Sequence, residues 1–460
     1  MLSQLVTRSG LLKRSCPPLI APWHTRTWTS YTQTPDALTI HALNNISFPY
    51  IWLRDSCQSS KCIHEKSTQK LHRSSDIPLN IAPIESPAGE GVRITPNGIN
   101  IVWNDGHTSS FDQAFLERHA STSKLMEWHL DHHLTEEAWT HTSLSNLPNL
   151  FIPYDKIKTS SGLVEAITQI SKYGLLFISG VPNQETSHDT CELRSLAERF
   201  GEIRPTFHGV FWDVVNGANG SRNIAYTDLE LGLHMDIMYV SFVVAVFNSR
   251  FFIFYFCILE YRYFQHPPRY QILHCLRNQV IGGKSIFVDA LGVARKLWES
   301  HPADFDILTK TPVSFHYKVD GHHLHHEHFT ISLAPHSTSS SSSSEQPPKI
   351  SHINYSPPFQ APLLLNTPKE FYTALARFAE MLNDPVNTFE YTLREGDAVF
   401  FDNRRVLHGR TAFRDKPGVE MKQGEISRLL KGCYLEADAL VDRVRVLRAK
   451  LELERELQKH

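Results

Sequence analysis

Short apolar runs separated by turn-forming residues recur along this chain and limit it to folds built mainly from short β-strands. Turn signals stand at 96–98 (Pro-Asn-Gly) and 104–106 (Asn-Asp-Gly). The runs expected to form strands are 46–53, 98–103, 174–180, 285–288, 313–317 and 398–401. Residues 163–173 and 190–200 instead carry apolar side chains at helical spacing. This pattern favours an α+β, mainly β fold in which a double-sheet core is flanked by a few helices.

The length of the chain predicts more than one domain. It has 460 residues, of which 41% are hydrophobic, so it can bury a large core. We predict a small β-rich N-terminal domain over residues 38–125 and a larger domain over 151–450. The Ser-rich run at 337–344 and the histidine-rich tract at 322–328 just before it are both interpreted as surface loops.

Charge and cysteine usage exclude several classes of protein. The formal net charge is −2, so no overall basic field would attract nucleic acid. The seven cysteines are scattered and odd in number, which is not the pattern of a secreted disulfide framework. Residues 1–35 contain basic and hydroxyl side chains but no Asp or Glu, as is typical of a mitochondrial presequence. The alternative is a disordered N-terminus on a cytoplasmic protein.

Residues 240–263 are more apolar and aromatic than any other stretch of the chain. Their length would suffice for a transmembrane helix, but Asn248, Ser249 and Arg250 near the middle would be costly in lipid. We therefore do not expect a membrane protein. The stretch begins with Val-Ser, which an in-frame splice donor would encode, and its 24 codons preserve the reading frame. We interpret it as a retained intron.

The spacing of His234 and Asp236 is suited to binding one metal ion. In an extended segment, residues two apart point to the same side, so an imidazole and a carboxylate could reach one ion together. His408 would complete a set of two histidines and one carboxylate, which leaves positions open for O2 chemistry at Fe(II). A 2-oxoglutarate cosubstrate would also need a cation for its distal carboxylate, and arginine provides a bidentate partner.

Several longer motifs resemble the carnitine-biosynthesis dioxygenases, which comprise gamma-butyrobetaine dioxygenase and its paralogue trimethyllysine dioxygenase. The motifs are WLRDSCQSSKC at 52–62, VWNDGH at 102–107, AYTDLELGLHMDIMY at 225–239, FQHPPRYQILHCL at 264–276, GGKSIFVDA at 282–290 and FDNRRVLHGR at 401–410. The resemblance runs from about 45 to 450 and passes over 240–263 and the His- and Ser-rich loop. It implies a double-stranded β-helix (jelly roll) domain preceded by a small zinc-binding domain.

By this resemblance, the iron ligands are His234, Asp236 and His408. Arg428 would pair with 2-oxoglutarate, and Ser285 would help to bind it. Because Arg428 lies far beyond His408, Arg410 and Arg414 stay open as alternatives.

The resemblance also implies a site for a trimethylammonium substrate, which aromatic faces hold by cation–π attraction. Trp212, Tyr226 and Tyr434 match the family's aromatic cage, whereas His208 stands where the family has a further tyrosine. Asn223 matches a residue that binds the substrate carboxylate. A second such asparagine is replaced by Ser356 or a neighbour.

The N-terminal motifs imply a zinc site. Cys57 and Cys62 have the spacing of a zinc knuckle, and His107 matches the family's distant histidine ligand. Ser59 stands where gamma-butyrobetaine enzymes have another cysteine, so the fourth ligand is open, with His64 as a local candidate.

The predicted reaction is hydroxylation of gamma-butyrobetaine to carnitine with Fe(II), 2-oxoglutarate, O2 and ascorbate as reductant, in a homodimer. Trimethyllysine or the substrate of a related paralogue is the alternative. If residues 240–263 are translated, they enter close behind Asp236, and a catalytically inactive product is a further hypothesis. A membrane-anchored binding protein is considered only because of that stretch.

Overall fold

The computed structural model describes residues 30–85, 91–215, 223–238, 267–319, 321–334, 348–417 and 426–459. The chain divides into two compact units, Met1–His129 and Leu130–His460. Most of the predicted presequence, the apolar stretch 240–263 and the Ser-rich run 337–344 lie outside the described residues. Within the described ranges, no helix combines the length and the apolar character needed to cross a bilayer.

The N-terminal unit contains two small antiparallel sheets and short helices. The strands are β1 (Tyr31–Gln33), β2 (Ala37–Ile40) and β3 (Ile46–Pro49) in one sheet, and β4 (Val92–Thr95), β5 (Gly98–Val102) and β6 (Thr108–Asp112) in the other; the helices are α1 (Tyr50–Asp55), α2 (Gln113–His119) and α3 (Thr122–Trp128). Trp103 lies fully buried in the core of this unit, and its indole nitrogen donates to Ser109.

The prediction of one strand over 46–53 is wrong in its second half. The strand ends at Pro49, and Tyr50 begins helix α1. Tyr50 and Leu53, three residues apart on this helix, are both buried in the core of the unit. Burial at a spacing of three residues is served by a helical turn, whereas a strand would place the two side chains on opposite faces.

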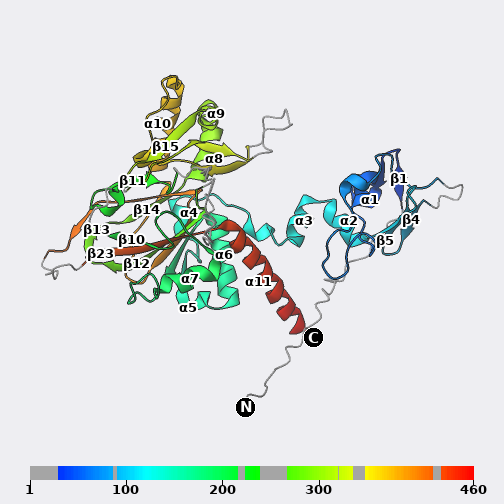
Figure 1. Ribbon diagram of the computed structural model, residues 1–460, viewed down its shortest axis with the longest axis horizontal. Helices are drawn as coiled ribbons and strands as arrows, with labels where there is room; N and C mark the ends of the chain where they lie inside the picture. Colours follow the sequence, from blue (N-terminus) through cyan, green and yellow to red (C-terminus); the bar gives the residue numbers. More distant parts are fainter. Residues whose placement is uncertain are drawn as a thin grey trace, which may run out of the picture. The chain divides into compact units, whose positions relative to one another are not determined.

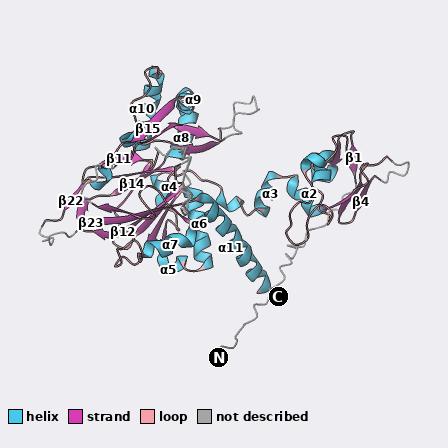
Figure 2. Cartoon of the chain, in the orientation of Figure 1, coloured by secondary structure: helices cyan, strands magenta, loops and turns pink. Residues whose placement is uncertain are grey.

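The larger unit is built on two sheets, which are antiparallel except for the parallel pair β7–β8 at one edge of the first (Figures 1 and 2). The first has the order β10-β23-β12-β20-β8-β7, with β9 also paired to β23, and the second has the order β11-β21-β14-β19. Strands of the first sheet are β7 (Phe151–Pro153), β8 (Leu175–Ser179), β9 (Ile203–Arg204), β10 (Trp212–Val215), β12 (Tyr270–Asn278), β20 (Ala398–Asp402) and β23 (Arg428–Leu435); those of the second are β11 (Leu231–His234), β14 (Ser285–Asp289), β19 (Thr388–Tyr391) and β21 (Val406–Arg410).

Apolar side chains from both sheets meet in a shared core that includes Phe177, Phe287 and Phe401. Two sheets that pack face to face agree with the predicted jelly roll. Three short two-stranded pairs complete the unit: β13 (Val280–Gly282) with β22 (Phe413–Asp415), β15 (Pro312–Tyr317) with β16 (Leu324–Phe329), and β17 (Ile331–Leu333) with β18 (Ile350–Ile353).

Helices pack outside the sheets and form two further cores with them. The first sheet is covered by α6, α7 and α11, whereas α8, α9 and α10 pack together beyond the second (Figure 1). Their bounds are α4 (His141–Ser145), α5 (Tyr154–Ile157), α6 (Ser160–Tyr173), α7 (Glu192–Phe200), α8 (Ala290–Ser300), α9 (Pro302–Lys310), α10 (Lys369–Asn383) and α11 (Ala437–Leu457). Helices α6 and α7 and strands β5, β8, β14, β15 and β20 confirm the corresponding predictions.

The loop predicted for the histidine-rich tract is wrong, because Leu324–Phe329 forms β16. This strand pairs with β15 through its whole length. Leu324, His326 and His328 alternate with exposed residues and are half-buried. His328 Nε2 lies 3.0 Å from the carbonyl oxygen of Met238, so these histidines belong to a hairpin with a partly buried face.

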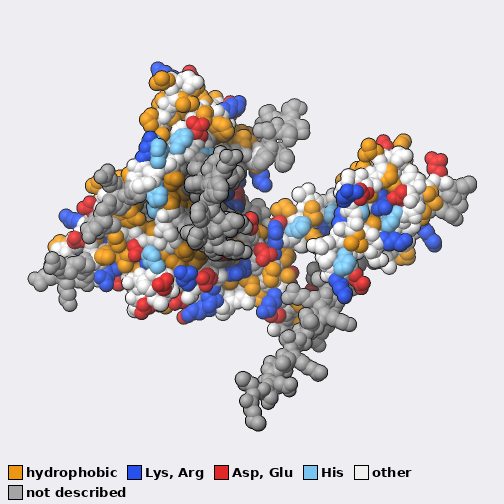
Figure 3. All heavy atoms as spheres, viewed as in Figure 1, with side chains coloured by type: hydrophobic (Ala, Val, Ile, Leu, Met, Phe, Trp, Pro, Cys, Tyr) orange, Lys and Arg blue, Asp and Glu red, His pale blue; other side chains and the backbone are white. Residues whose placement is uncertain are grey.

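On the surface drawn in Figure 3, positive and negative side chains are interspersed.

Candidate active site

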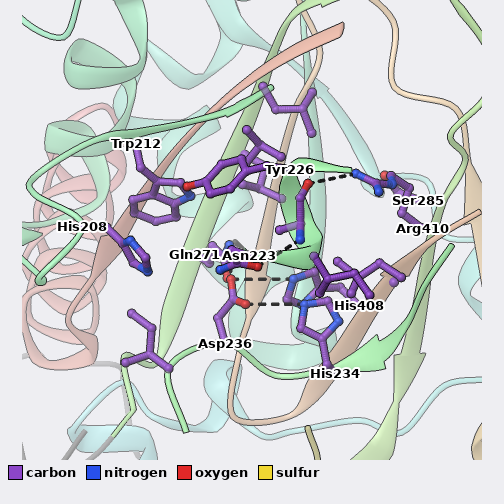
Figure 4. A pocket seen from close by; sticks show the side chains of 18 of the residues that line it. His208, Trp212, Asn223, Tyr226, His234, Asp236, Gln271, Ser285, His408 and Arg410 are labelled. Carbon is purple, nitrogen blue, oxygen red and sulfur yellow. Dashed lines mark hydrogen bonds and ion pairs between the residues drawn. The ribbon is translucent and has the colours of Figure 1, made fainter. Parts of the chain in front are cut away.

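A cavity lined from both sheets of the larger unit brings together residues from distant parts of the sequence (Figure 4). Strands β11, β14 and β21 line it from one sheet, and β10, β12 and β23 line it from the other. Ten residues predicted from the sequence line this cavity: His208, Trp212, Asn223, Tyr226, His234, Asp236, Ser285, His408, Arg428 and Tyr434.

His234 and His408 meet because they lie directly opposite each other on β11 and β21. Their ring centres are 4.2 Å apart. Asp236 follows two residues after His234, and its carboxylate oxygens lie 3.5 Å from His234 Nε2 and 3.8 Å from His408 Nε2. Each of the three residues offers one potential ligand atom, and these three atoms all lie within 4.8 Å of one another. Two imidazoles and one carboxylate on a cavity wall form a donor set suited to non-haem Fe(II).

The protonation states of His408 and Asp236 also suit a metal. Burial, together with nearby His234, lowers the pKa of His408 to about 3 against the opposing effect of Asp236. Burial alone would raise the pKa of Asp236, but His408, His234 and a hydrogen bond from Gln271 hold it well below its usual value. Nδ1 of His234 faces the carbonyl of Gly232 at 2.8 Å, which leaves Nε2 for the cluster. Neutral imidazoles and an ionised carboxylate are the forms that bind metal.

Three residues hold Asp236, and two of them, Gln271 and Asn403, were not singled out from the sequence. Gln271 Nε2 and the Tyr434 hydroxyl donate to Asp236 Oδ2 at 2.9 and 3.0 Å. The side chain of Asn403 bonds both the backbone N–H and the carbonyl of Asp236, at 2.9 and 3.1 Å. Gln271 had a sequence signal, because it is a polar residue inside the apolar strand of the 264–276 motif and must find a polar partner when buried. For Tyr434, the ring was predicted as a cage wall but the role of its hydroxyl was missed.

Of the three candidate arginines, Arg428 alone reaches the cavity without using its guanidinium elsewhere in the described residues. Arg428 is buried, its Nε has no hydrogen-bond partner in the part of the chain that the structure describes, and its guanidinium carbon lies 5.2 Å from the centre of the Phe413 ring. Arg410 also lines the cavity but donates to the carbonyls of Ala225, Thr227 and Leu229. Arg414 is exposed on β22.

The aromatic residues are arranged as a wall more than as an open cage. The rings of Trp212 and Tyr434 stack with centres 4.2 Å apart and planes at 24°. Gly432 makes this possible, because a side chain there would place its Cβ 2.5 Å from the Trp212 ring. His208 lies at the edge of this wall, 6.3 Å from Trp212, and is half-buried. Together, Trp212 and Tyr434 are called the aromatic wall below.

Other predicted substrate contacts have mixed outcomes. Tyr226 lines the cavity from a short 3-10 helix, Ile224–Tyr226. Arg410 donates a hydrogen bond to the carbonyl of Ala225 in this helix. Asn223 caps this turn by accepting from Ala225 N–H at 2.9 Å. Ser356 is buried but is not among the residues that line the cavity.

In the N-terminal unit, Cys57, Cys62 and His107 form a second group with metal-binding geometry. His107 Nε2 lies 3.2 Å from Cys57 Sγ and 3.5 Å from Cys62 Sγ. Burial alone would raise the pKa of Cys57, but hydrogen bonds involving Ser109 and Ser59 lower it overall. His64 is exposed and lies outside this group, and its Nδ1 accepts from Ser67 N–H.

Comparison with known proteins identifies both units of the chain. Residues 36–117 match the model described as gamma-butyrobetaine hydroxylase-like, N-terminal. Residues 259–434 match the taurine catabolism dioxygenase TauD, TfdA family. The latter range includes His408 and Arg428 but begins after His234 and Asp236.

Relatives match over nearly the whole chain. Dioxygenase str8 of Strobilurus tenacellus is 46% identical over 420 residues, covering 91% of this chain and 89% of the relative. Human gamma-butyrobetaine dioxygenase is 27% identical, covering 88% of this chain and 92% of the relative. Human mitochondrial trimethyllysine dioxygenase is 26% identical, covering 94% and 92%. The chain therefore belongs to the gamma-butyrobetaine and trimethyllysine dioxygenase family, which are Fe(II)- and 2-oxoglutarate-dependent oxygenases of the TauD/TfdA type.

Proposed function

We propose that this dioxygenase binds Fe(II) through His234, Asp236 and His408 and anchors 2-oxoglutarate through Arg428. The observation that carries the proposal is the buried Arg428 guanidinium, which lines the cavity with no hydrogen-bond partner at Nε among the described residues. A buried cation without a counter-ion is unfavourable, so an anionic ligand is expected to complete it. The dicarboxylate 2-oxoglutarate supplies such an anion.

When bound, Fe(II) would supply the redox chemistry by which O2 converts 2-oxoglutarate to succinate and CO2 and a substrate C–H to C–OH. The chain positions the reactants. Arg428 holds the distal carboxylate, and Ser285 on the neighbouring sheet offers a hydroxyl to the same ligand. Leu273, Leu430 and Phe287 line the cavity and limit its water content. Ascorbate is expected to keep iron reduced.

The first candidate substrate is gamma-butyrobetaine, with carnitine as its product. Trp212, Tyr434 and Tyr226 give one side of the cavity aromatic faces, which attract a trimethylammonium group. Asn223 lies beside Tyr226 as a partner for the substrate carboxylate. Relatives that are named for gamma-butyrobetaine are 27–28% identical to this chain over most of its length.

A substrate outside the carnitine pathway is the second candidate, and two observations favour it. The rings of Trp212 and Tyr434 contact each other, so a cation could rest on the wall but not between its two members. His208 stands at the position of a cage tyrosine, and a protonated imidazole would repel a cation. An apolar substrate would fill the same cavity without these penalties.

Turnover assays with purified full-length protein separate these candidates. Protein supplied with Fe(II), ascorbate and 2-oxoglutarate should release succinate faster when gamma-butyrobetaine is added. Acceleration by trimethyllysine alone would transfer the assignment to that substrate. If neither compound accelerates turnover while 2-oxoglutarate still binds, the second candidate replaces the first.

We also propose that Cys57, Cys62 and His107 bind one structural zinc ion. Two thiolates and an imidazole are ligands that zinc prefers, and the Arg54–Asp105 ion pair, 2.8 Å long, supports the site because Asp105 also accepts from His107 N–H. A fourth ligand is not supplied by His64. Metal analysis of the purified protein should find one zinc per chain in addition to iron.

For localisation and assembly we propose a mitochondrial homodimer. The acid-free composition of residues 1–35 and relatives named as mitochondrial trimethyllysine dioxygenases support import. A fluorescent fusion that stays in the cytoplasm would overturn the mitochondrial assignment, and light scattering measures the mass of the assembly.

The retained-intron hypothesis predicts spliced transcripts that lack the codons for 240–263. If all transcripts keep them, the inactive-product hypothesis gains support.

A further inference from the structure

We propose that Tyr434 and Gln271 are positioning residues that together orient Asp236 for metal binding, and that Tyr434 also connects this carboxylate to the aromatic wall. This inference rests on the proposed role of Asp236 as an iron ligand. It assigns Tyr434 a second role beside that of an aromatic surface, and it assigns Gln271 a role that its chemistry alone would not suggest.

Two donors converge on one carboxylate oxygen. Gln271 Nε2 and the Tyr434 hydroxyl lie 2.9 and 3.0 Å from Asp236 Oδ2. The other oxygen, Oδ1, faces His234 Nε2 at 3.5 Å. Because Oδ2 accepts two hydrogen bonds, the carboxylate is held in one rotation, in which Oδ1 faces His234 and Oδ2 lies 3.8 Å from His408 Nε2. Figure 4 shows Asp236 directed toward His234 and His408, with Gln271 behind it.

The two donors come from rigid parts of the fold. Gln271 and Tyr434 are cross-strand partners on β12 and β23 in the middle of the larger sheet, and both are almost completely buried. Asp236 itself follows the end of β11 and has no regular structure to hold it. Ligands that lie outside regular elements depend on surrounding hydrogen bonds for their orientation.

The backbone around Asp236 is also held in one conformation. Ile237 has a φ of 59°, a left-handed conformation that is unusual for a β-branched residue. Asn403, which is fully buried, bonds the N–H and the carbonyl of Asp236 and so holds the chain in this conformation. With the backbone held by Asn403, the rotation of the Asp236 side chain is left to Gln271 and Tyr434.

Tyr434 links two parts of the site. Its hydroxyl binds the carboxylate, while its ring stacks on Trp212 at 4.2 Å. A substrate that settles against the aromatic wall therefore contacts a side chain that is bonded to a metal ligand. Any displacement of the Tyr434 ring on binding would change the hydrogen bond to Asp236 Oδ2.

The test compares Tyr434→Phe and Gln271→Met with the unchanged protein in anaerobic Fe(II) titrations at saturating 2-oxoglutarate. Each substitution keeps the volume of the side chain and removes one donor. Loss of a residue that supports a metal ligand lowers metal affinity by roughly 10- to 100-fold. We expect each variant to show this loss, with no fall in the unfolding temperature of the metal-free protein. The double variant should lose less than the product of the two, because both donors act on one oxygen.

Tyr391→Phe is the matched control, since it removes a tyrosine hydroxyl that donates to Asp397, on a residue that does not line the cavity. It should leave the affinity for Fe(II) unchanged. The inference is overturned if both single variants bind Fe(II) within threefold of the unchanged protein. If the unchanged protein itself binds no Fe(II), the proposed function fails instead, so the two failures are distinguishable.

Discussion

Replacing Arg428 with methionine should separate ligand binding from folding. Methionine keeps an apolar chain of similar length in the site but removes the charge. In the complex, the guanidinium and the carboxylate would both be withdrawn from water, and truncating one member of such a pair costs about 2–5 kcal/mol. At about 1.4 kcal/mol per tenfold change, this corresponds to roughly 30- to 4,000-fold weaker binding of 2-oxoglutarate.

The expected value lies in the lower part of that range, because other groups remain. Burial and, to a smaller extent, the nearby charge of Arg428 lower the pKa of Arg410. Arg410 therefore lies close to Arg428, and the region stays positive when Arg428 is removed. Ser285 also stays in the cavity. We therefore expect the dissociation constant of 2-oxoglutarate to rise by about 30- to 300-fold, or about 2–3.5 kcal/mol.

The stability of the protein without metal and without 2-oxoglutarate should not fall when Arg428 is replaced. Arg428 is buried and forms no ion pair with any residue that the structure describes, so its removal should not lower the unfolding temperature. In the unchanged protein, 2-oxoglutarate at 100 times its dissociation constant should add about 2.7 kcal/mol of stability, and at the same concentration the variant should keep less than about 1 kcal/mol of that gain.

Calorimetric titration with Mn(II) in place of iron, together with thermal unfolding, measures both effects. Arg414→Gln is the control, because Arg414 is exposed and should not alter either quantity. Binding of 2-oxoglutarate by Arg428→Met within threefold of the unchanged protein would refute the assignment. A variant that unfolds at a lower temperature without ligand would show that the guanidinium has a structural partner.

Three further predictions concern stability and the second metal site. Arg405→Met should lower the free energy of unfolding by about 3–5 kcal/mol in a denaturant titration, since it leaves the buried carboxylate of Asp289 unpaired. Lys310→Met, which breaks the exposed ion pair with Asp306, should change it by less than about 1 kcal/mol in the same titration. Gly432→Ala should cost about 1–3 kcal/mol and weaken substrate binding, because its Cβ would clash with Trp212; unchanged unfolding would contradict the stacked wall. Cys62→Ser should reduce bound zinc to well below one per chain by elemental analysis while the iron content is kept.

The convergence of His234, Asp236 and His408 could be predicted from the sequence, because part of the geometry follows from simple periodicity. His234 and Asp236 are two residues apart, and His408 lies in a strand that pairs with β11. The same alternation in β23 brings Arg428 and Tyr434 to the cavity side of one strand. Where a strand runs straight, residues two apart share a face, so the side that a residue lines can be read from the sequence.

The choice among arginines could not be made from the sequence, because it depends on long-range contacts. Arg410 is as close to His408 as any candidate, but it binds carbonyls of residues 225–229 that lie about 180 positions away. The hydrogen bonds that hold Asp236 were missed for the same reason, since Gln271 reaches it from β12 and Asn403 reaches it from the turn after β20. The histidine-rich tract was misjudged for a different reason, because it forms β16 by pairing with the neighbouring strand β15 in a hairpin that its polar composition did not indicate.

Iron- and oxygen-dependent consumption of 2-oxoglutarate by the purified full-length chain tests the central claim most directly. The unchanged protein should bind one Fe(II) at the cavity cluster and convert 2-oxoglutarate to equal amounts of succinate and CO2, and this conversion should require both Fe(II) and O2. His408→Ala and Asp236→Ala should each lose the bound iron and the conversion together, while both variants stay folded. If either variant keeps iron and still forms succinate at the original rate, the cluster of His234, Asp236 and His408 is not the catalytic centre.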